Sequence, residues 1–267
     1  MRIIDESTPL EEHGVRASWV MKPGCEPEQS AYDLPAEHVV RVSVGGEPTM
    51  SLTCTPRHIV ELVVGRLFTE NVISGVDEIE EVRLCAGETQ VLVELFPSAD
   101  VPANAGAVVE DVGTCYVERR SVSSLIRRDE NLPQLDPISW TPEDVFTLAR
   151  VFKGDAPMHK KTYGAHSCYL ARGSEVLYCC EDLGRHNAFD KVIGCALMDG
   201  VDLRECTVFT SGRVPTDMAL KAVRARIPIM VSKAVPTDLA VRMAQEHKLT
   251  LICSAHPDSF VVVNDPR

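Results

Sequence analysis

Five polar side chains that can bind a ligand lie within the seven positions 181–187, which read Glu-Asp-Leu-Gly-Arg-His-Asn. The apolar run 176–180 before them predicts a buried strand, and a pattern typical of a helix follows. In open α/β sheets, ligands bind beyond the carboxyl ends of the strands. We therefore predict that Arg185, His186 and Asn187 contact a ligand. The alternative is a solvated turn in which Asn187 caps the next helix.

A second candidate site is the stretch 211–217, Ser-Gly-Arg-Val-Pro-Thr-Asp, which returns at 232–238 as Ser-Lys-Ala-Val-Pro-Thr-Asp. Each copy follows an apolar run, and its Pro-Thr-Asp ending is typical of the start of a helix. The unpaired backbone N–H groups of a helix start, with a basic residue nearby, suit phosphate oxygens. We expect Ser211, Gly212 and Arg213 to contact such a ligand. Two strand–helix units can also resemble each other for packing reasons alone.

The third candidate follows the apolar run 250–252 and should emerge at the same edge of the sheet. Its histidine could contact a phosphate group. An ordinary exit turn is the alternative, since proline and aspartate are common in turns. The expected binding segment consists of Cys253, Ser254, Ala255, His256, Pro257 and Asp258.

Cys115 is the candidate nucleophile. It precedes a possible helix over 121–128, and Arg119 and Arg120 lie close to it in the sequence. A helix N-terminus and neighbouring arginines lower the pKa of a thiol and so increase the fraction of the nucleophilic thiolate. Glu118 acts in the opposite direction. Local chemistry therefore leaves a reactive thiol and a passive one both open.

The composition excludes several classes of protein. The 267-residue chain has a formal net charge of −12, whereas nonspecific nucleic-acid binding needs a basic surface. No apolar stretch is long enough to span a membrane, and acidic residues near the start argue against a secretory signal. The 10 cysteines lack the regular spacing of a disulfide framework. We expect a soluble, reduced protein of the cytoplasm that binds neither nucleic acid nor membrane.

The spacing of histidine and cysteine predicts no metal site. Zinc sites usually show paired ligands at short spacing, such as Cys-x-x-Cys. Cys179 and Cys180 are adjacent in an apolar run, where core packing is the expected role. His166 lacks the later glutamate and the Pro-Cys-x-x-Cys of the zinc deaminases. Cys195 lies in an ordinary core or loop context, so we expect no bound metal.

The pattern of elements predicts an α/β protein, α+β overall, that divides near a proline-containing stretch into residues 1–136 and 137–267. The first part is a smaller, β-rich region that ends in the loop of the candidate nucleophile Cys115. A hairpin is expected around Gly45-Gly46, and paired strands at 79–85 and 90–96. Between them, Thr55-Pro56 should open a helix.

The second part should alternate strands with helices, after a first helix that starts at Thr141-Pro142. Such alternation predicts helices that cover a largely parallel sheet. The expected strands are 167–171, 176–180, 207–210, 227–231 and 249–252, and the expected helices are 187–198, 216–225 and 237–246.

Several motifs, in this order and spacing, together resemble one known family. They are Thr-Pro at 55–56, Gly-Arg-Leu-Phe-Thr-Glu at 65–70, Thr-Tyr-Gly-Ala-His at 162–166, the stretch 181–194, and Thr-Ser-Gly-Arg at 210–213 with Pro-Thr at 236–237. The chain is similar to the formate dehydrogenase accessory sulfurtransferases, or FdhD-type proteins. Each motif alone is weak, but together they cover most of the chain.

The resemblance implies sulfur delivery. Such proteins take sulfane sulfur from a cysteine desulfurase as a persulfide, here on Cys115, and pass it to the molybdenum of bis(molybdopterin guanine dinucleotide) before this cofactor enters formate dehydrogenase. The resemblance also implies a homodimer, and a C-terminal three-layer α/β domain similar to cytidine deaminase without its zinc site. The three candidate segments would bind the cofactor, and a guanine nucleotide would mimic it.

One departure from the family pattern concerns the reactive loop. The family usually has Cys-Gly-x-Cys-Gly, whereas residues 115–119 are Cys-Tyr-Val-Glu-Arg, so Glu118 replaces the second cysteine. A single thiolate suffices to hold a persulfide. We therefore predict a sulfurtransferase that acts through Cys115. A chaperone that binds the cofactor without transferring sulfur is the alternative, and a deaminase-like hydrolase is disfavoured because the zinc ligands are missing.

Overall fold

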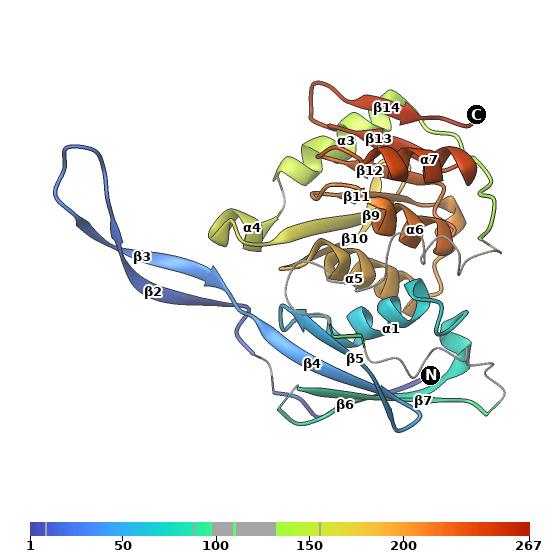
Figure 1. The fold of residues 1–267 in the computed structure, drawn as a ribbon, viewed down its shortest axis with the longest axis horizontal. Helices are drawn as coiled ribbons and strands as arrows, with labels where there is room; N and C mark the ends of the chain where they lie inside the picture. Colours follow the sequence, from blue (N-terminus) through green and yellow to red (C-terminus); the bar gives the residue numbers. More distant parts are fainter. Residues whose placement is uncertain (9, 88, 98–108, 111–131, 155) are drawn as a thin grey trace.

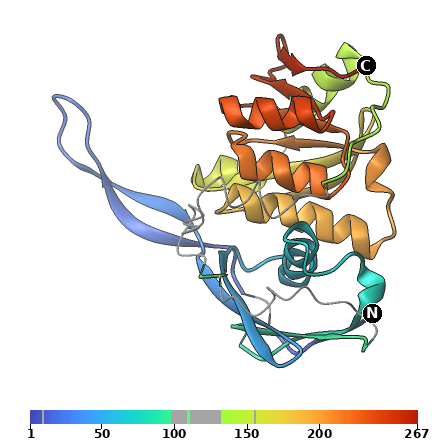
Figure 2. The ribbon, with the colours of Figure 1, turned by 45° about the vertical axis from the view of Figure 1, so that its right-hand side comes forward.

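The computed structural model describes residues 1–267 except 9, 88, 98–108, 111–131 and 155 (Figure 1). Over these residues the chain forms two six-stranded sheets and a separate two-stranded hairpin. Helices lie between the sheets and on both faces of the second sheet (Figure 2). The predicted α/β class is therefore confirmed. The finer likeness to cytidine deaminase stays a prediction.

The first sheet belongs to the N-terminal half and carries helix α1 (Ile59–Thr69) on one face (Figure 1). Alternate residues of one strand, Val40, Val42 and Val44, are buried against it. Gly45 and Gly46 have positive φ angles of 58° and 81° and form the turn of the predicted hairpin. Across the sheet the strands are β1 (Arg2–Asp5), β6 (Ile79–Leu84), β7 (Gln90–Leu95), β4 (His38–Val44), β5 (Glu47–Cys54) and β8 (Val109–Glu110).

The hairpin of β2 (His13–Val20) and β3 (Glu28–Pro35) projects from the body as an arm (Figure 1). Its apolar side chains are largely exposed, with Trp19 at 65% and Tyr32 at 56%. The base of the arm contacts α4 (Pro157–Thr162) through an ion pair of 3.7 Å between Lys161 Nζ and Asp33 Oδ1. The sequence pattern did not predict this arm, because its strands lack a buried face.

Helices α1 (Ile59–Thr69) and α5 (Arg185–Met198) pack directly against each other and join the two halves (Figure 1). A Cβ atom on Gly65 would lie 1.9 Å from the carbonyl oxygen of Asp190, and one on Gly194 would lie 1.9 Å from that of Glu61. Only glycine therefore allows this approach. The short helix η1 (Val76–Glu78) follows α1.

Two predicted helix starts were wrong by a few residues. Helix α1 begins at Ile59 rather than at Thr55-Pro56, because His58 has a left-handed backbone with φ 54°. Helix α5 begins at Arg185 rather than at 187, directly after the extended Gly184. This second difference changes the directions in which the candidate ligand-binding side chains point.

The second sheet belongs to the C-terminal half. Its strands β11 (Thr207–Thr210), β12 (Ile229–Ser232) and β13 (Thr250–Cys253) are parallel, as predicted, whereas its outer pairs are antiparallel. The expectation of a largely parallel sheet was therefore wrong. The short turn at Gly173 joins Arg172 directly to Glu175, and so short a connection allows only an antiparallel pair, because parallel strands need a crossover. In order, the strands are β10 (Glu175–Asp182), β9 (His166–Arg172), β11 (Thr207–Thr210), β12 (Ile229–Ser232), β13 (Thr250–Cys253) and β14 (Val261–Asn264).

Alternation along the central strands builds a core on each face of this sheet. Val208 packs under α5, α6 (Thr216–Arg224) and α7 (Asp238–Glu246), and Phe209 packs under α3 (Pro142–Gly154) on the opposite face (Figure 2). The helix starts predicted at 216 and 237 are confirmed within one residue, and Thr237 Oγ1 caps α7 by accepting the N–H of Ala240 at 3.3 Å. The short helix η2 (Leu203–Glu205) precedes β11.

The segment before α3 lies against the C-terminal half. Leu135 is buried in the core under α7, and its N–H donates to the carbonyl oxygen of His247 at 3.0 Å. The domain division expected at 136 stays a prediction. None of the helices in the described part of the chain is long and apolar enough to cross a bilayer.

Candidate anion-binding cleft

Three strand-end segments of the second sheet meet at one edge. Strand β10 ends at Asp182, which pairs with His166 at the start of β9. Strand β11 ends at Thr210, which pairs with Ser232 at the end of its parallel neighbour β12. Strand β13 ends at Cys253, and one residue of each candidate segment, Arg185, Ser211 and His256, lines the same cavity at this edge. The predicted convergence of the three candidate segments is therefore observed.

A cleft of about 640 Å³ opens at this edge. It is bounded by α4 on one side and by the strand ends on the other. A neighbouring hollow of about 580 Å³ shares Phe152, Lys153, Lys233 and His256 with it, so the two form one continuous surface. The side chains of the larger cleft that bear on its chemistry are Lys153, His159, Lys160, His166, Arg185, Ser211, Lys233 and His256.

The cleft is basic although the chain carries a formal net charge of −12. Lysines come from α3, α4 and the loop after β12, and none of the described residues that line the larger cleft is acidic. Charges of one sign that line a concave site attract a ligand of the opposite charge more strongly than the same charges on a flat surface. This arrangement suits an anion such as a phosphate or diphosphate group.

Arg185 is the most prominent donor in the cleft. Its Nε atom is buried and finds no acceptor among the described residues. A side chain on Gly212 would meet Arg185 Cδ at 2.8 Å, so the glycine makes room for the arginine. A buried guanidinium N–H without a partner is costly, which makes this atom a natural donor to a bound anion.

Ser211 and His166 form a hydrogen-bonded pair in the cleft. Ser211 Oγ lies 3.0 Å from His166 Nδ1 and accepts the N–H of Ser167 at 3.1 Å. Burial, together with the nearby charge of Arg185, lowers the pKa of His166 below its ordinary value. The imidazole is therefore neutral at neutral pH and can accept the hydroxyl hydrogen of Ser211.

Glu181 positions one wall of the cleft without lining it. Its carboxylate accepts the N–H groups of Met158 and His159 at 2.8 Å each, at the first turn of α4. A carboxylate there satisfies free backbone donors and the helix dipole. Glu181 thus fixes α4, which brings His159 and Lys160 to the cleft.

Two of the predicted ligand-binding residues point elsewhere. His186 is 4% exposed, and its Nε2 lies 2.9 Å from Asp217 Oδ2. The Asn187 amide donates to the carbonyl oxygen of Thr53 at 2.7 Å, and its oxygen accepts from Arg66 at 2.9 Å. Neither side chain lines the larger cleft, and Asn187 does not cap α5 because it lies inside this helix.

Asn187 belongs to a buried ionic cluster between α1, α5 and α6, which the sequence pattern did not reveal. Asp182 pairs with Lys191 at 2.6 Å, and both side chains are fully buried. Asp190 pairs with Arg66 at 2.7 Å and with Lys221 at 2.9 Å. The pair of Arg66 with Asp190 joins the two halves, as do the hydrogen bonds that Thr55 donates to Asp182 at 3.0 and 3.1 Å. These partners are too far apart in the sequence for spacing to reveal them.

The repeat at 211–217 and 232–238 corresponds to two adjacent strand–helix units. Val214 and Pro236 form a parallel bridge, and Thr237 N donates to the carbonyl oxygen of Val214 at 3.0 Å. Packing therefore explains much of the similarity between the copies. Ser211 and Lys233 line the cleft, whereas Arg213 is exposed and lines neither of the two cavities.

The segment 253–258 combines both roles considered for it. Cys253 is buried at the end of β13, and His256 N donates to the carbonyl oxygen of Ser259 at 2.8 Å in a tight turn. His256 is nevertheless exposed and lines both cavities, while Pro257 and Asp258 line the smaller one. Ser254 N donates to the carbonyl oxygen of Ala234 in the loop after β12, and Ala255 N donates to that of Ser232 at the end of β12, each at 3.0 Å. The expected nucleophile Cys115, with Glu118, lies outside the described residues.

Comparison with known proteins identifies the family. A family model described as the FdhD/NarQ family matches residues 35–267. This chain belongs to the FdhD/NarQ family. The resemblance predicted from the motifs is thus confirmed, and the match includes the whole of the cleft.

Curated members of the FdhD/NarQ family are similar to the chain along most of its length. The sulfur carrier protein FdhD of Listeria innocua is 28% identical over 228 residues, covering 81% of this chain and 83% of the relative. Its namesake in Bacillus subtilis is 29% identical, covering 86% and 88%. That of Methanothermobacter thermautotrophicus is 29% identical, covering 85% and 88%.

The fold is shared with a solved structure. A crystal structure of a protein from Desulfotalea psychrophila, assigned as a formate dehydrogenase accessory protein, superposes with a TM-score of 0.76 at 23% identity. The superposition covers 96% of this chain and 98% of the other. The arrangement of the two sheets is therefore not peculiar to this FdhD/NarQ member.

Proposed function

We propose that this chain is a sulfur carrier that accepts sulfane sulfur from a cysteine desulfurase. It passes this sulfur to the molybdenum of bis(molybdopterin guanine dinucleotide), the cofactor of formate dehydrogenase. The basic cleft beside Arg185 is the observation that carries the proposal. The curated relatives named sulfur carrier protein FdhD support it.

The molybdenum cofactor is the substrate of this transfer, and its phosphate groups match the cleft. Lys153, Lys160 and Lys233 supply positive charge from three different elements, and Arg185 supplies a guanidinium fork. Ser211 and His256 add polar groups at the ends of β11 and β13. A guanine nucleotide such as GDP presents the same diphosphate and base, and so serves as a probe of the site.

The chemistry of sulfur acceptance needs one thiolate. Cys115 attacks the outer sulfur of the persulfide on the desulfurase, an S–S bond forms on Cys115, and the donor's S–S bond breaks with release of its thiolate. The Glu118 that replaces a second cysteine leaves this step intact, because no resolving thiol takes part in it.

The test is to incubate the purified protein with a cysteine desulfurase and cysteine, and then to measure peptide masses. We expect one additional sulfur atom on the peptide that contains Cys115 and none in Cys115→Ser. Cys25→Ser is the matched control, because Cys25 is an exposed cysteine elsewhere and its loss should change nothing. In cells, Cys115→Ser should fail to mature formate dehydrogenase.

A cofactor-binding chaperone without sulfur transfer is the second candidate, and Glu118 at the second cysteine position favours it. The same experiment separates the two. Binding of GDP in the cleft without any gain of sulfur on Cys115 would support the chaperone and refute the carrier. Both candidate functions involve the same expected partners, namely formate dehydrogenase and a second copy of this chain in a homodimer.

A further inference from the structure

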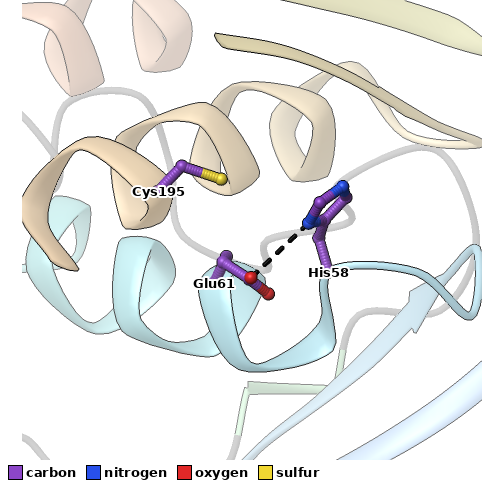
Figure 3. Close-up of side chains that lie close together, drawn as sticks. All are labelled: His58, Glu61 and Cys195. Atoms are coloured by element: carbon purple, nitrogen blue, oxygen red, sulfur yellow. Dashed lines mark ion pairs between the residues drawn. The ribbon is translucent and has the colours of Figure 1, made fainter. Parts of the chain in front are cut away.

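A group of potential metal donors lies apart from the cleft, between the two helices that join the halves. Among the residues that the structure describes, His58, Glu61 and Cys195 form a group whose donor atoms all lie within 4.8 Å of one another. His58 directly precedes α1, Glu61 lies in its first turn, and Cys195 comes from α5 (Figure 3). We propose that these three side chains form a binding site for a zinc-like divalent cation.

The distances fit such an ion. With ligand bonds of about 2.0–2.3 Å in a tetrahedron, neighbouring donor atoms are about 3.3–3.8 Å apart. His58 Nδ1 and Glu61 Oε1 are already 3.5 Å apart. The thiol of Cys195, which is hydrogen-bonded to Cys180 without the metal, therefore needs to approach by no more than about 1 Å.

The donor set selects the class of metal. Imidazole nitrogen, thiolate sulfur and carboxylate oxygen together suit Zn²⁺, whereas Mg²⁺ and Ca²⁺ prefer oxygen ligands alone. Loss of the thiol proton of Cys195 on binding gives a thiolate, and with the Glu61 carboxylate the two negative charges balance a divalent cation.

The backbone around the site is rigid. Gly194, next to Cys195, approaches Glu61 so closely that an added Cβ would lie 1.9 Å from the carbonyl oxygen of Glu61. The two elements that carry the donors are thus fixed against each other at the site itself. His58 has a left-handed backbone (φ 54°), a conformation that non-glycine residues adopt seldom and mainly where it serves a local purpose. In this conformation the imidazole of His58 lies beside the carboxylate of Glu61 (Figure 3).

The site also has an approach for a ligand from outside. His58 and Glu61 line a pocket of about 390 Å³ that is separate from the basic cleft. Asp5 and Glu12 also line it, but Arg57 lies there too and pairs with Glu12 at 3.2 Å, so Asp5 and Glu61 are the acids that favour the entry of a cation. Three protein ligands leave one position of a tetrahedral zinc open, which is typical of sites that exchange a bound water or substrate rather than of closed structural sites.

The test uses the full-length protein, freed of metal and kept reduced. Zn²⁺ alone is titrated by calorimetry, and Co²⁺ alone is followed by its absorption spectrum. We expect one tight site with a thiolate-to-cobalt charge-transfer band. Cys195→Ser should abolish the band, and Glu61→Gln and His58→Asn should each weaken Zn²⁺ binding by more than about tenfold. Asparagine is chosen at 58 because it tolerates the left-handed backbone.

Cys85→Ser and Cys115→Ser are the controls, because they remove thiols outside the group and should leave the band and the affinity unchanged. Thermal unfolding without metal establishes that each variant is folded. The proposal is overturned if the wild-type protein binds no Co²⁺ or Zn²⁺. It is equally overturned if Cys195→Ser keeps the charge-transfer band, or if binding depends on Cys115 instead. Substitution of His58, Glu61 or Cys195 leaves the proposed sulfur carrier Cys115 in place, so the metal site and the proposed function can fail or hold independently.

Discussion

At the scale of residues, Arg185 differs from its two neighbours in the motif although all three were predicted to bind a ligand. Successive residues of a helix point in directions about 100° apart, so only part of such a run can face one cleft. Arg185 lines the cleft, while His186 contacts Asp217 and Asn187 contacts Arg66. The sequence predicted the strand end, and therefore the edge of the sheet at which the cleft opens. It could not select the residue, because this depends on where α5 begins.

Arg185→Ala is expected to weaken GDP binding by about 1.5–3 kcal/mol, because it removes a charge-assisted hydrogen bond inside a concave site. Arg213→Ala is the matched control, since Arg213 is exposed and lines neither cavity. Its loss should have a clearly smaller effect. Calorimetry on the two variants measures the difference, and equal losses would place the nucleotide outside the cleft.

At the scale of elements, the contact between α1 and α5 determines how the two halves meet. The apolar face of α1, with Ile59, Leu62 and Leu67, was visible in its periodicity and is buried as expected. The glycines Gly65 and Gly194 carry no such periodic signal. A glycine inside a helix lowers helix propensity, and its benefit is visible only when the partner backbone is known.

Gly65→Ala should destabilise the protein by about 1–3 kcal/mol, because the new methyl group would overlap the backbone of Asp190 and force the helices apart. Gly154→Ala at the end of α3 is the control: an added Cβ meets nothing within 4 Å there. Chemical denaturation of both variants gives the comparison. Wild-type stability in Gly65→Ala would show that the two helices lie farther apart.

At the scale of the whole molecule, buried charges join the halves in addition to apolar packing. Arg66 on α1 and Lys221 on α6 reach the same carboxylate, Asp190 on α5. In a single sequence each of these residues looks like part of a solvated helix face, because nothing in its local pattern identifies a partner from another region. Strands, helices and the edge that carries the cleft could thus be predicted, since their signals are local. The antiparallel pairing of β9 with β10 follows from the short turn at Gly173 between them. The ionic cluster, by contrast, can be recognised only once the fold is known.

Glu70 gives this ionic cluster a dependence on pH. Its carboxylate is 23% exposed and lies 3.3 Å from Lys221 Nζ and 3.6 Å from Arg66 Nη1. Burial alone would raise its pKa, but the charges of Lys221, Arg66 and Arg224 outweigh burial and lower the pKa from 4.5 to about 2. An acid whose pKa is lower in the folded protein stabilises the fold above its unfolded pKa and loses this contribution as pH falls.

Glu70→Gln should therefore lower the free energy of unfolding at pH 7 by about 2–3 kcal/mol. Between pH 4.5 and about pH 2 the unfolded wild-type chain takes up a proton that the folded protein still excludes, so the gap between wild type and variant should shrink as pH falls through this window. Glu80→Gln, at an exposed acid of β6, is the control and should show a small difference at every pH. Urea denaturation at a series of pH values measures both variants. A gap for Glu70→Gln that stays constant down to the lowest pH at which the protein folds would mean that Glu70 contributes through packing, and that its charge does not help to hold the two halves together.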